Sequence, residues 1–300
     1  MRRFLLIGAG ACLTLTGCAS LHYRILTVHH DAAMVLKAPI PSCPPFRHYD
    51  KLEKDAVNPD LVADIWQCVT VITHPDDISM PEVRYLKRDY FTELASHDCE
   101  RENGMLRKLC SAQRAEIRKQ AVAELGENYV RSYDPWIARQ LVFTRYDCAS
   151  SADPHQRSAC RTNRKNLTDG YYFALARTFL TPDRIEIYQR KIDDNNEEWD
   201  KIYKSMDVSN SYYEDVAFLY VTIAHEMIHV ALGRRNVDIL DQHAMMHDRH
   251  YLQAVSNAIS DSLRIDRGGN HWERALSSLR AGEEVDATAK QTQQQIMNQK

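Results

Sequence analysis

The stretch Ala224-His-Glu-Met-Ile-His-Val-Ala-Leu-Gly233 contains the pattern His-Glu-x-x-His, formed by His225, Glu226 and His229. Residues four apart on a helix lie one above the other on the same face, so the two histidines can direct their imidazole nitrogens at one metal ion. Glu226 points away from coordination, where its carboxylate can reach a water molecule beside the metal and act as a general base. The pattern therefore predicts a metal site on a helix.

The flanking sequence predicts that this helix is long and buried. Ser211 and Glu214 form a capping box at its start, and the run that follows is almost entirely apolar. Gly233 is placed to end the helix, and Arg234 and Arg235 lie at the negative end of its dipole, where cations are favoured. Buried histidine and glutamate side chains need partners, because burying a polar group without one is costly.

A catalytic zinc site has three protein ligands and one open position, so a third ligand must come from the downstream sequence. The candidates are His243, His247 and His250. His247 begins the sequence His-Asp-Arg-His-Tyr, in which Tyr251 follows four positions later. His243 lies one helical turn before His247 and remains the alternative ligand.

The His-Glu-x-x-His motif, followed by His247 and Tyr251, resembles the SprT-like branch of the zincin metalloproteases. In that branch the third histidine opens a helix after a short connection, and an aromatic residue follows it by four positions. The resemblance covers at most residues 170–260, and Asp248 stands where the family usually has glycine. It implies that the two motif histidines and His247 bind one Zn²⁺ per chain and that Glu226 is catalytic.

The resemblance further implies hydrolysis of peptide bonds in a protein or peptide substrate, by water that the metal activates. One alternative is a zinc amidase or endopeptidase that acts on peptidoglycan cross-links. Another is a non-catalytic zinc-binding envelope lipoprotein, whose metal site is structural and whose helical half binds a partner. The implied fold is α+β and zincin-like: a small sheet, the active helix and a backing helix from about His247 to Leu263, preceded by a disulfide-tied helical region.

The first residues predict export and attachment to a membrane. Two arginines precede the apolar segment Phe4–Leu15, which is too short to span a bilayer as a mature helix. Leu15-Thr-Gly-Cys18 resembles a bacterial lipobox, so processing would remove residues 1–17 and attach lipid to Cys18. Ala19 then favours the periplasmic face of the outer membrane in a bacterial cell envelope. The alternatives are an ordinary signal peptide and an uncleaved anchor.

Composition is that of a globular protein, with 44% hydrophobic and 26% charged residues. SprT-like proteins are often associated with DNA, but the net charge of −3 provides no basic field of the kind that nucleic-acid binding requires. We therefore expect no nucleic-acid partner.

Six cysteines remain once Cys12 leaves with the signal segment and Cys18 takes lipid. An even number of cysteines in an exported protein indicates disulfides, and the sequence alone does not choose among the pairings. Pairing in sequence order closes the shortest loops and is our prediction. No C-x-x-C pattern occurs, which disfavours a cysteine metal site. The predicted pairs are Cys43–Cys68, Cys99–Cys110 and Cys148–Cys160.

The chain divides by composition after the signal segment. Residues 18–57 contain four prolines and predict a tether and irregular lead-in. Residues 58–135 predict a mostly helical region, and residues 136–267 the zincin-like metalloprotease core. Residues 268–300 predict a polar, largely disordered tail, because their last part is rich in glutamine and poor in apolar residues.

Three helices are predicted in the first half of the chain. Asn58 is a favourable N-cap followed by proline, which indicates a helix to about Thr73. A capping box at its start predicts a helix over 79–97, and a third is predicted over 111–125, ending at Gly126.

The region before the active helix predicts strands. Residues 137–146 contain Leu-Val-Phe-Thr and indicate a strand. Residues 184–190 alternate polar and apolar side chains after a turn at 181–183, as a half-buried strand does. Zincins use a strand before the active helix as the wall of the substrate cleft, where substrate can pair with a free strand edge; the alternative is an internal strand. Residues 193–210 predict a polar connection.

Overall fold

A computed structural model gives the fold. It describes residues 42–49, 52–53, 56–145, 148–150, 154, 157–158, 161, 174–180, 183–205, 212–248 and 250–264. The predicted signal segment, the predicted lipidation site Cys18, the capping residue Ser211 and the predicted tail 268–300 lie outside these residues.

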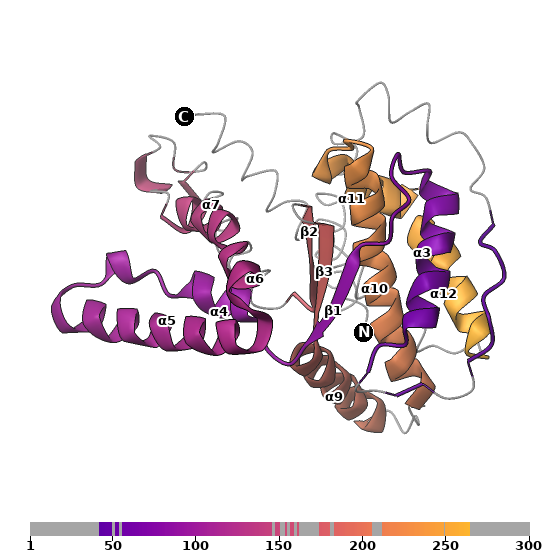
Figure 1. The fold of residues 1–300 in the computed structure, drawn as a ribbon, viewed down its shortest axis with the longest axis horizontal. Coiled ribbons are helices and arrows are strands. Elements are labelled where there is room, and N and C mark those ends of the chain that lie inside the picture. Colours follow the sequence, from indigo (N-terminus) through magenta and orange to yellow (C-terminus); the bar gives the residue numbers. More distant parts are fainter. Residues whose placement is uncertain are drawn as a thin grey trace, which may run out of the picture.

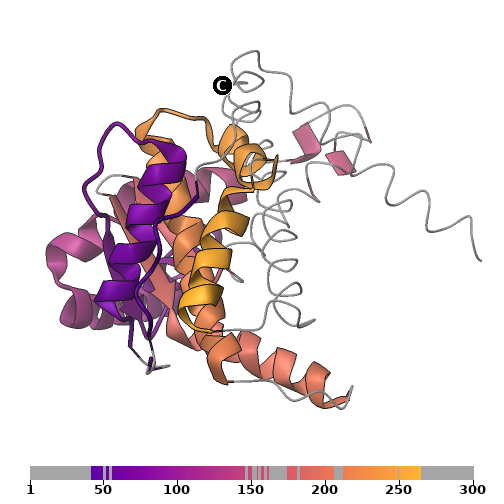
Figure 2. The same ribbon diagram turned by 90° about the vertical axis from the view of Figure 1, so that its right-hand side faces the viewer.

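Helix α10 (Tyr212–Arg234) carries the His-Glu-x-x-His motif and forms the centre of the main core. Helices α3 (Pro59–Thr73) and α12 (Tyr251–Ser262) pack beside it on one side, and the sheet packs on the other (Figures 1 and 2). The part from Val216 to Arg234 is long and apolar enough to cross a membrane, but most of it is buried inside the protein, as in the core helix of a globular domain.

The described sheet has three strands in the order β1-β3-β2. β1 (Glu82–Leu86) pairs parallel to β3 (Asp183–Tyr188), and β2 (Ala176–Leu180) pairs antiparallel to β3. The predicted strand at 184–190 is confirmed as β3, although it ends at Tyr188. It is the central strand of the described sheet, so the internal alternative holds for it, and β2 is the edge strand of the described sheet that packs against α10.

A second, smaller core lies against the other face of the sheet. Its helices are α4 (Tyr90–Ser96), α5 (Gly104–Leu125), α6 (Glu127–Arg131) and α7 (Asp134–Thr144). Phe179 of β2 packs into this core, whereas Ile185 and Ile187 of β3 belong to the core around α10. Successive side chains of a strand point to opposite faces, so the two faces of one short sheet contribute side chains to two different cores. The coarse α+β prediction is therefore confirmed, with a small sheet and disulfide-tied helices.

Two of the helices predicted from local sequence patterns are confirmed. The Asn58 side chain accepts hydrogen bonds from the backbone N–H groups of Asp60 (2.9 Å) and Leu61 (3.2 Å), and α3 runs to Thr73 as predicted. The helix predicted over 111–125 is confirmed as part of α5, which begins earlier and ends at Gly126.

The prediction of one helix over 79–97 is wrong. Ser79 bonds to the carboxylate of Asp77 (2.8 and 2.9 Å), and the residues that follow form β1 instead. Pairing with β3, about a hundred residues later in the chain, outweighs the local capping pattern. Helix α4 begins only after Asp89, whose carboxylate accepts from the N–H of Thr92 (2.9 Å).

Two further assignments between α6 and α10 are wrong. Residues 137–144 of the strand predicted over 137–146 lie in α7, because a short apolar run fits a buried helix as well as a strand. The polar connection predicted over 193–210 is helical through Ser205, as part of α9 (Gln189–Ser205). Ile192 anchors this helix in the main core, and its exposed face carries a Glu197–Lys201 ion pair of 3.2 Å.

The end of α10 also differs from the prediction. Gly233 lies inside the helix, and a Cβ atom there would lie 3.1 Å from both terminal methyls of Leu180. The helix ends at Arg234, and Asn236, two residues beyond it, has a φ of 56°. The N–H of Asn236 bonds to the carbonyl of Gly233 (2.9 Å) and that of Val237 to the carbonyl of Leu232 (3.1 Å), which is a Schellman motif.

The backing helix predicted from about His247 to Leu263 is confirmed as α12, but it begins later, at Tyr251. Helix α11 (Ile239–Asp248) precedes α12, and His250 stands between them in a left-handed conformation with φ of 53°. His243 and His247 therefore lie one turn apart on α11 rather than at the start of α12.

Two predicted disulfides are confirmed. Cys43 and Cys68 are bonded with their Cα atoms 4.8 Å apart, and Cys99 and Cys110 with theirs 5.5 Å apart. Cys148 is also disulfide-bonded, but Cys160, its predicted partner, lies outside the described residues.

Candidate metal centre

The two histidines of the motif are arranged as a pair on α10. Their Nε2 atoms lie 3.2 Å apart and their ring centroids 4.8 Å apart. Two histidine ligands of a tetrahedral zinc ion, each about 2.0–2.1 Å from it, have nitrogens roughly 3.3 Å apart. The spacing of His225 and His229 therefore fits a shared metal ion. It also fits a hydrogen bond from one imidazole to the other, and metal content distinguishes the two.

Gln242 of α11 fixes the orientation of His229. Its side-chain oxygen lies 2.8 Å from Nδ1 of His229, and its side-chain nitrogen donates to the carbonyl of Val237 (2.9 Å). Because the nitrogen end is held by a carbonyl, the oxygen end faces the imidazole and accepts from Nδ1–H. A neutral His229 then carries its lone pair on Nε2, on the side of His225. Metal-binding histidines are commonly held by such a bond from the other ring nitrogen.

Glu226 lies beside this pair and contacts the sheet. One carboxylate oxygen is 4.0 Å from Nε2 of His225, and the other accepts a hydrogen bond of 2.5 Å from the hydroxyl of Thr178. Thr178 belongs to β2, so the edge strand holds the carboxylate in place. The side chain of Glu226 is 12% exposed, which leaves one side open to solvent.

The three candidate third ligands have different positions. His243 is buried, and its ring centroid lies 4.7 Å from that of His229 in an edge-to-face contact. His247 follows one turn later on α11, and its side chain lies outside the described residues. His250 is exposed in the short segment before α12. Helix α11 is thus the element that brings a further histidine to the pair.

Within the described part of the chain, no group of three or more His, Cys, Asp or Glu side chains is arranged to hold a metal ion. The described residues therefore supply the His225–His229 pair, and a complete site requires a further ligand to approach it.

Two residues of the site were not found from the sequence. The sequence analysis does not single out Gln242, and only its position before His243 would draw attention to it. Thr178 lies 48 residues from Glu226 in the sequence, and no local pattern connects them.

A different buried cluster lies on the opposite face of β3. Both carboxylate oxygens of Glu186 accept hydrogen bonds: from the hydroxyls of Tyr129 (2.7 Å), Tyr133 (2.9 Å) and Tyr188 (3.0 Å), and from Nε of Arg184 (3.1 Å). Burial raises the pKa of Glu186 above its ordinary value, although the Arg184 charge and the three hydroxyls oppose this.

Asp89, at the start of α4, belongs to the same polar layer. Burial acts to raise its pKa, but the charges of Arg177 and Lys191, which both contact it, hold that pKa below the ordinary value. This carboxylate is therefore ionised at neutral pH and joins α4 to β2 and α9.

Comparison with models of protein families, with curated proteins and with solved structures found no match.

Proposed function

We propose that this protein is a zinc-dependent peptidase that a lipid on Cys18 holds at the bacterial cell envelope. The observation that carries the proposal is the position of Glu226 next to the pair of Nε2 atoms, 3.2 Å apart, on one turn of a buried helix. A half-buried Glu that is held by Thr178 and lies beside His225 of the pair is suited to metal-assisted hydrolysis.

The ligands in this proposal are His225, His229 and one histidine of α11. His247 is the ligand expected from the sequence, and His243 is its rival because its ring contacts that of His229. When bound, a zinc ion supplies the polarisation that makes water a nucleophile near neutral pH. Gln242 keeps the lone pair of His229 on Nε2, which is the form that can act as a ligand.

Glu226 performs the proton transfers. Its carboxylate accepts a proton from the attacking water and later donates it to the leaving amine of the cleaved peptide. Thr178 holds one oxygen of this carboxylate, which leaves the other for the water.

The substrate in this proposal is an extended peptide beside β2. This strand is an edge of the described sheet, and its Thr178 touches Glu226. An extended chain that adds to a sheet edge gains backbone hydrogen bonds without needing a particular sequence. Its scissile bond would then lie near the glutamate.

The test compares wild type with Glu226→Gln, both produced from Ala19 onward. Glutamine keeps the size of the side chain and removes its basicity. Because Glu226 is not a ligand, zinc content should be the same in both, while cleavage of an unfolded protein mixture falls about 10³-fold. Equal cleavage by the two proteins would contradict the role of Glu226.

A second function has one observation in its favour. His243 contacts His229 and lies one turn from His247 on α11. If both α11 histidines joined the motif pair, four ligands would close the site, as in structural zinc centres. The protein would then be a non-catalytic zinc-binding lipoprotein, and Glu226→Gln would change no measurable activity.

A further inference from the structure

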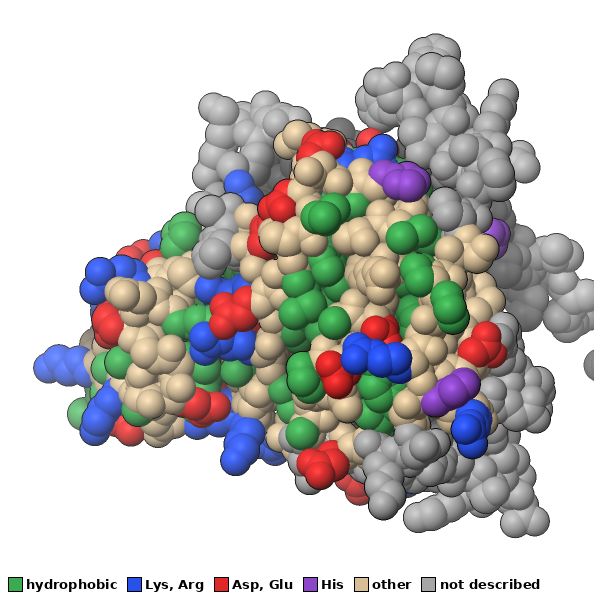
Figure 3. All heavy atoms as spheres, turned by 45° about the vertical axis from the view of Figure 1, so that its right-hand side comes forward, with side chains coloured by type: hydrophobic (Ala, Val, Ile, Leu, Met, Phe, Trp, Pro, Cys, Tyr) green, Lys and Arg blue, Asp and Glu red, His purple; other side chains and the backbone are tan. Residues whose placement is uncertain are grey.

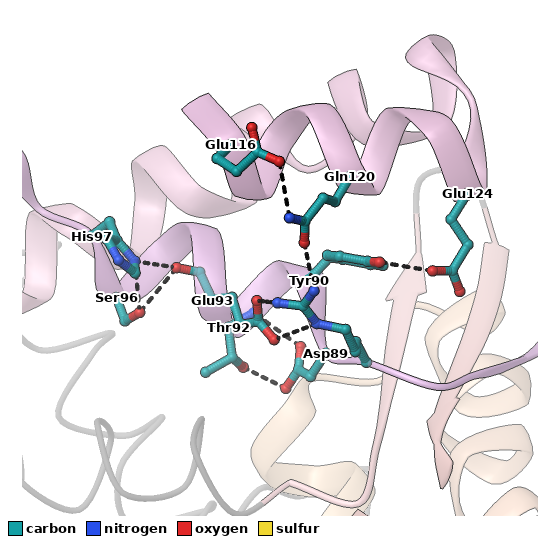
Figure 4. A network of polar contacts seen from close by, with 10 residues as sticks. Asp89, Tyr90, Thr92, Glu93, Ser96, His97, Glu116, Gln120 and Glu124 are labelled. Carbon is teal, nitrogen blue, oxygen red and sulfur yellow. Dashed lines mark hydrogen bonds and ion pairs between the residues drawn. The ribbon is translucent and has the colours of Figure 1, made fainter. Parts of the chain in front are cut away.

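Helix α5 begins far from the rest of the protein. Figure 1 shows it extending away from the sheet, with its C-terminal end next to α6. Its residues are exposed or half-buried up to Ala121, the first to be fully buried. The C-terminal half is fixed to α4, where the Tyr90 hydroxyl donates to Glu124 (2.7 Å) as part of a polar network (Figure 4). The N-terminal half therefore projects into solvent from a firmly held base.

Three large apolar side chains lie on the projecting half. Met105 is 78% exposed, Leu106 62% and Leu109 55%, and we call these three residues the α5 tip. They make up half of the large exposed apolar side chains among the described residues. The Cys99–Cys110 disulfide ties this part of the helix to the preceding turn, so the tip is presented on a constrained support.

Basic residues lie on the same helix as the α5 tip. Helix α5 carries five basic side chains and only two acidic ones, in a chain whose net charge is −3. Three arginines spaced seven and four residues apart line one hollow of about 390 Å³ beside the helix, and Arg118 among them also pairs with Asp134 (2.8 Å). Figure 3 shows blue side chains interspersed with red and green ones at the left of the molecule. The hollow is lined by Cys99, Glu100, Arg107, Ser111, Arg114, Ala115 and Arg118.

We infer that the α5 tip docks on an anionic lipid surface, with its apolar side chains in the interface and Arg107 and Lys108, which lie among them, on the headgroups. A helix with apolar side chains at its end and a basic flank is suited to the boundary between headgroups and acyl chains. Three side chains are too few for a stable protein interface, which buries about 800 Å² per partner, whereas a lipid surface requires no matching shape. This inference is independent of zinc and of Glu226.

The experiment measures amide hydrogen exchange in the full chain with and without vesicles. Vesicles of phosphatidylglycerol and phosphatidylethanolamine provide an anionic surface, and phosphatidylcholine vesicles a neutral one. We expect amides 105–110 to exchange about tenfold more slowly on the anionic vesicles and to be unchanged on the neutral ones. Salt at about 1 M, where the Debye length is about 3 Å, should reduce the protection.

Two variants test the two halves of the inference. The triple variant Met105→Ser, Leu106→Ser, Leu109→Ser removes the apolar tip, and Arg107→Glu with Lys108→Glu reverses the local charge. Both should lose the protection, since each basic residue near an anionic surface contributes about a fivefold gain in binding. All the substituted side chains are exposed, so the fold should be retained.

The matched control is Ile78→Ser with Met80→Ser, which removes two exposed apolar side chains (72% and 50%) from another part of the surface. It should keep full protection of amides 105–110. No protection of wild type on anionic vesicles would overturn the inference. Equal protection of wild type and the triple variant would overturn it too, because the contact would then lie elsewhere.

Discussion

Two clusters of polar side chains in the described part of the protein differ in the groups that surround them. On one face of β3, Glu186 accepts hydrogen bonds from three tyrosines and an arginine, so its oxygens are satisfied by the protein itself. On α10, His225 and His229 bring two imidazole nitrogens within 3.2 Å of each other, and Gln242 directs a lone pair of one toward the other. Two ring nitrogens at this distance need a proton or a cation between them.

The two clusters differ in the chemistry of the groups that face each other. Buried polar groups are almost always hydrogen-bonded, so burial of Glu186 or His229 alone indicates no function. The chemical type of the groups that contact each side chain distinguishes the two clusters. Protein donors surround the Glu186 carboxylate, whereas the two facing imidazole nitrogens on α10 are spaced for either a shared metal ion or a hydrogen bond between the rings.

Removing the Glu186 carboxylate should have the largest effect on stability. Glu186→Leu leaves the guanidinium of Arg184, which is almost fully buried, without its carboxylate. We expect the free energy of unfolding to fall by about 4 kcal/mol, measured by urea denaturation. Zinc binding by the folded protein should be unchanged.

The matched control replaces both members of the pair, as Arg184→Met with Glu186→Leu. Apolar replacement of a buried ion pair is often close to neutral, so this double variant should recover much of the lost stability. If Glu186→Leu abolished zinc binding while the protein remained folded, the claim that the Glu186 cluster takes no part in zinc binding would be wrong.

Asp89→Asn should lower stability by about 3 kcal/mol at pH 7, because Arg177 and Lys191 lose their shared carboxylate. The folded-state pKa of Asp89 lies below its unfolded value of about 3.9. The contribution of the ionised group is therefore fully present above that value and is lost as the pH falls through the folded-state pKa. Urea denaturation from pH 7 to pH 3 should show the difference between wild type and variant shrinking. A constant difference would contradict this.

Gln242→Leu tests the other cluster. Losing the acceptor for Nδ1–H of His229 should weaken zinc binding about 10- to 100-fold, as is typical for a residue that orients a metal-binding histidine. Competition with a chelator of known affinity measures the change. Gln242→Glu keeps an acceptor oxygen and should lose less than Gln242→Leu; equal losses would assign Gln242 a packing role only.

Substitutions of Asn236, just after the end of α10, should have the smallest effect on stability. Asn236 has a φ of 56°, a conformation that costs most residues about 1–2 kcal/mol. Asn236→Ala should lower stability by about 1 kcal/mol, whereas Asn236→Gly should be close to neutral. Thermal unfolding measures both. A loss for glycine as large as that for alanine would mean that the asparagine side chain, not the backbone, stabilises this turn.

How far the sequence predicts the structure depends on whether a signal is local. The N-cap at Asn58 and the long apolar run of α10 were sufficient to place their helices. The strand β1 was missed because its partner β3 lies about a hundred residues away. The strand prediction over 137–146 is wrong because a short apolar run has no decisive period.

The residues of the candidate site also differ in whether a local sequence pattern reveals them. Two histidines and a glutamate at helical spacing identified the pair on α10 from sequence. Gln242 and Thr178 act through contacts that only the fold creates, and the division between α11 and α12 follows from the left-handed conformation of His250. Glu186 bonds to Tyr133 and Tyr129, which lie 53 and 57 residues away in the sequence, and no spacing pattern could reveal these contacts.

The central claim is that His225 and His229 share a zinc ion, and metal content tests it most directly. Elemental analysis should find about one zinc per chain in wild type and in Glu226→Gln, and almost none in His225→Ala or His229→Ala. Cobalt in place of zinc should give the absorption of a tetrahedral site in the first two proteins only. A wild-type protein that binds no zinc, or histidine variants that bind as much as wild type, would contradict the account.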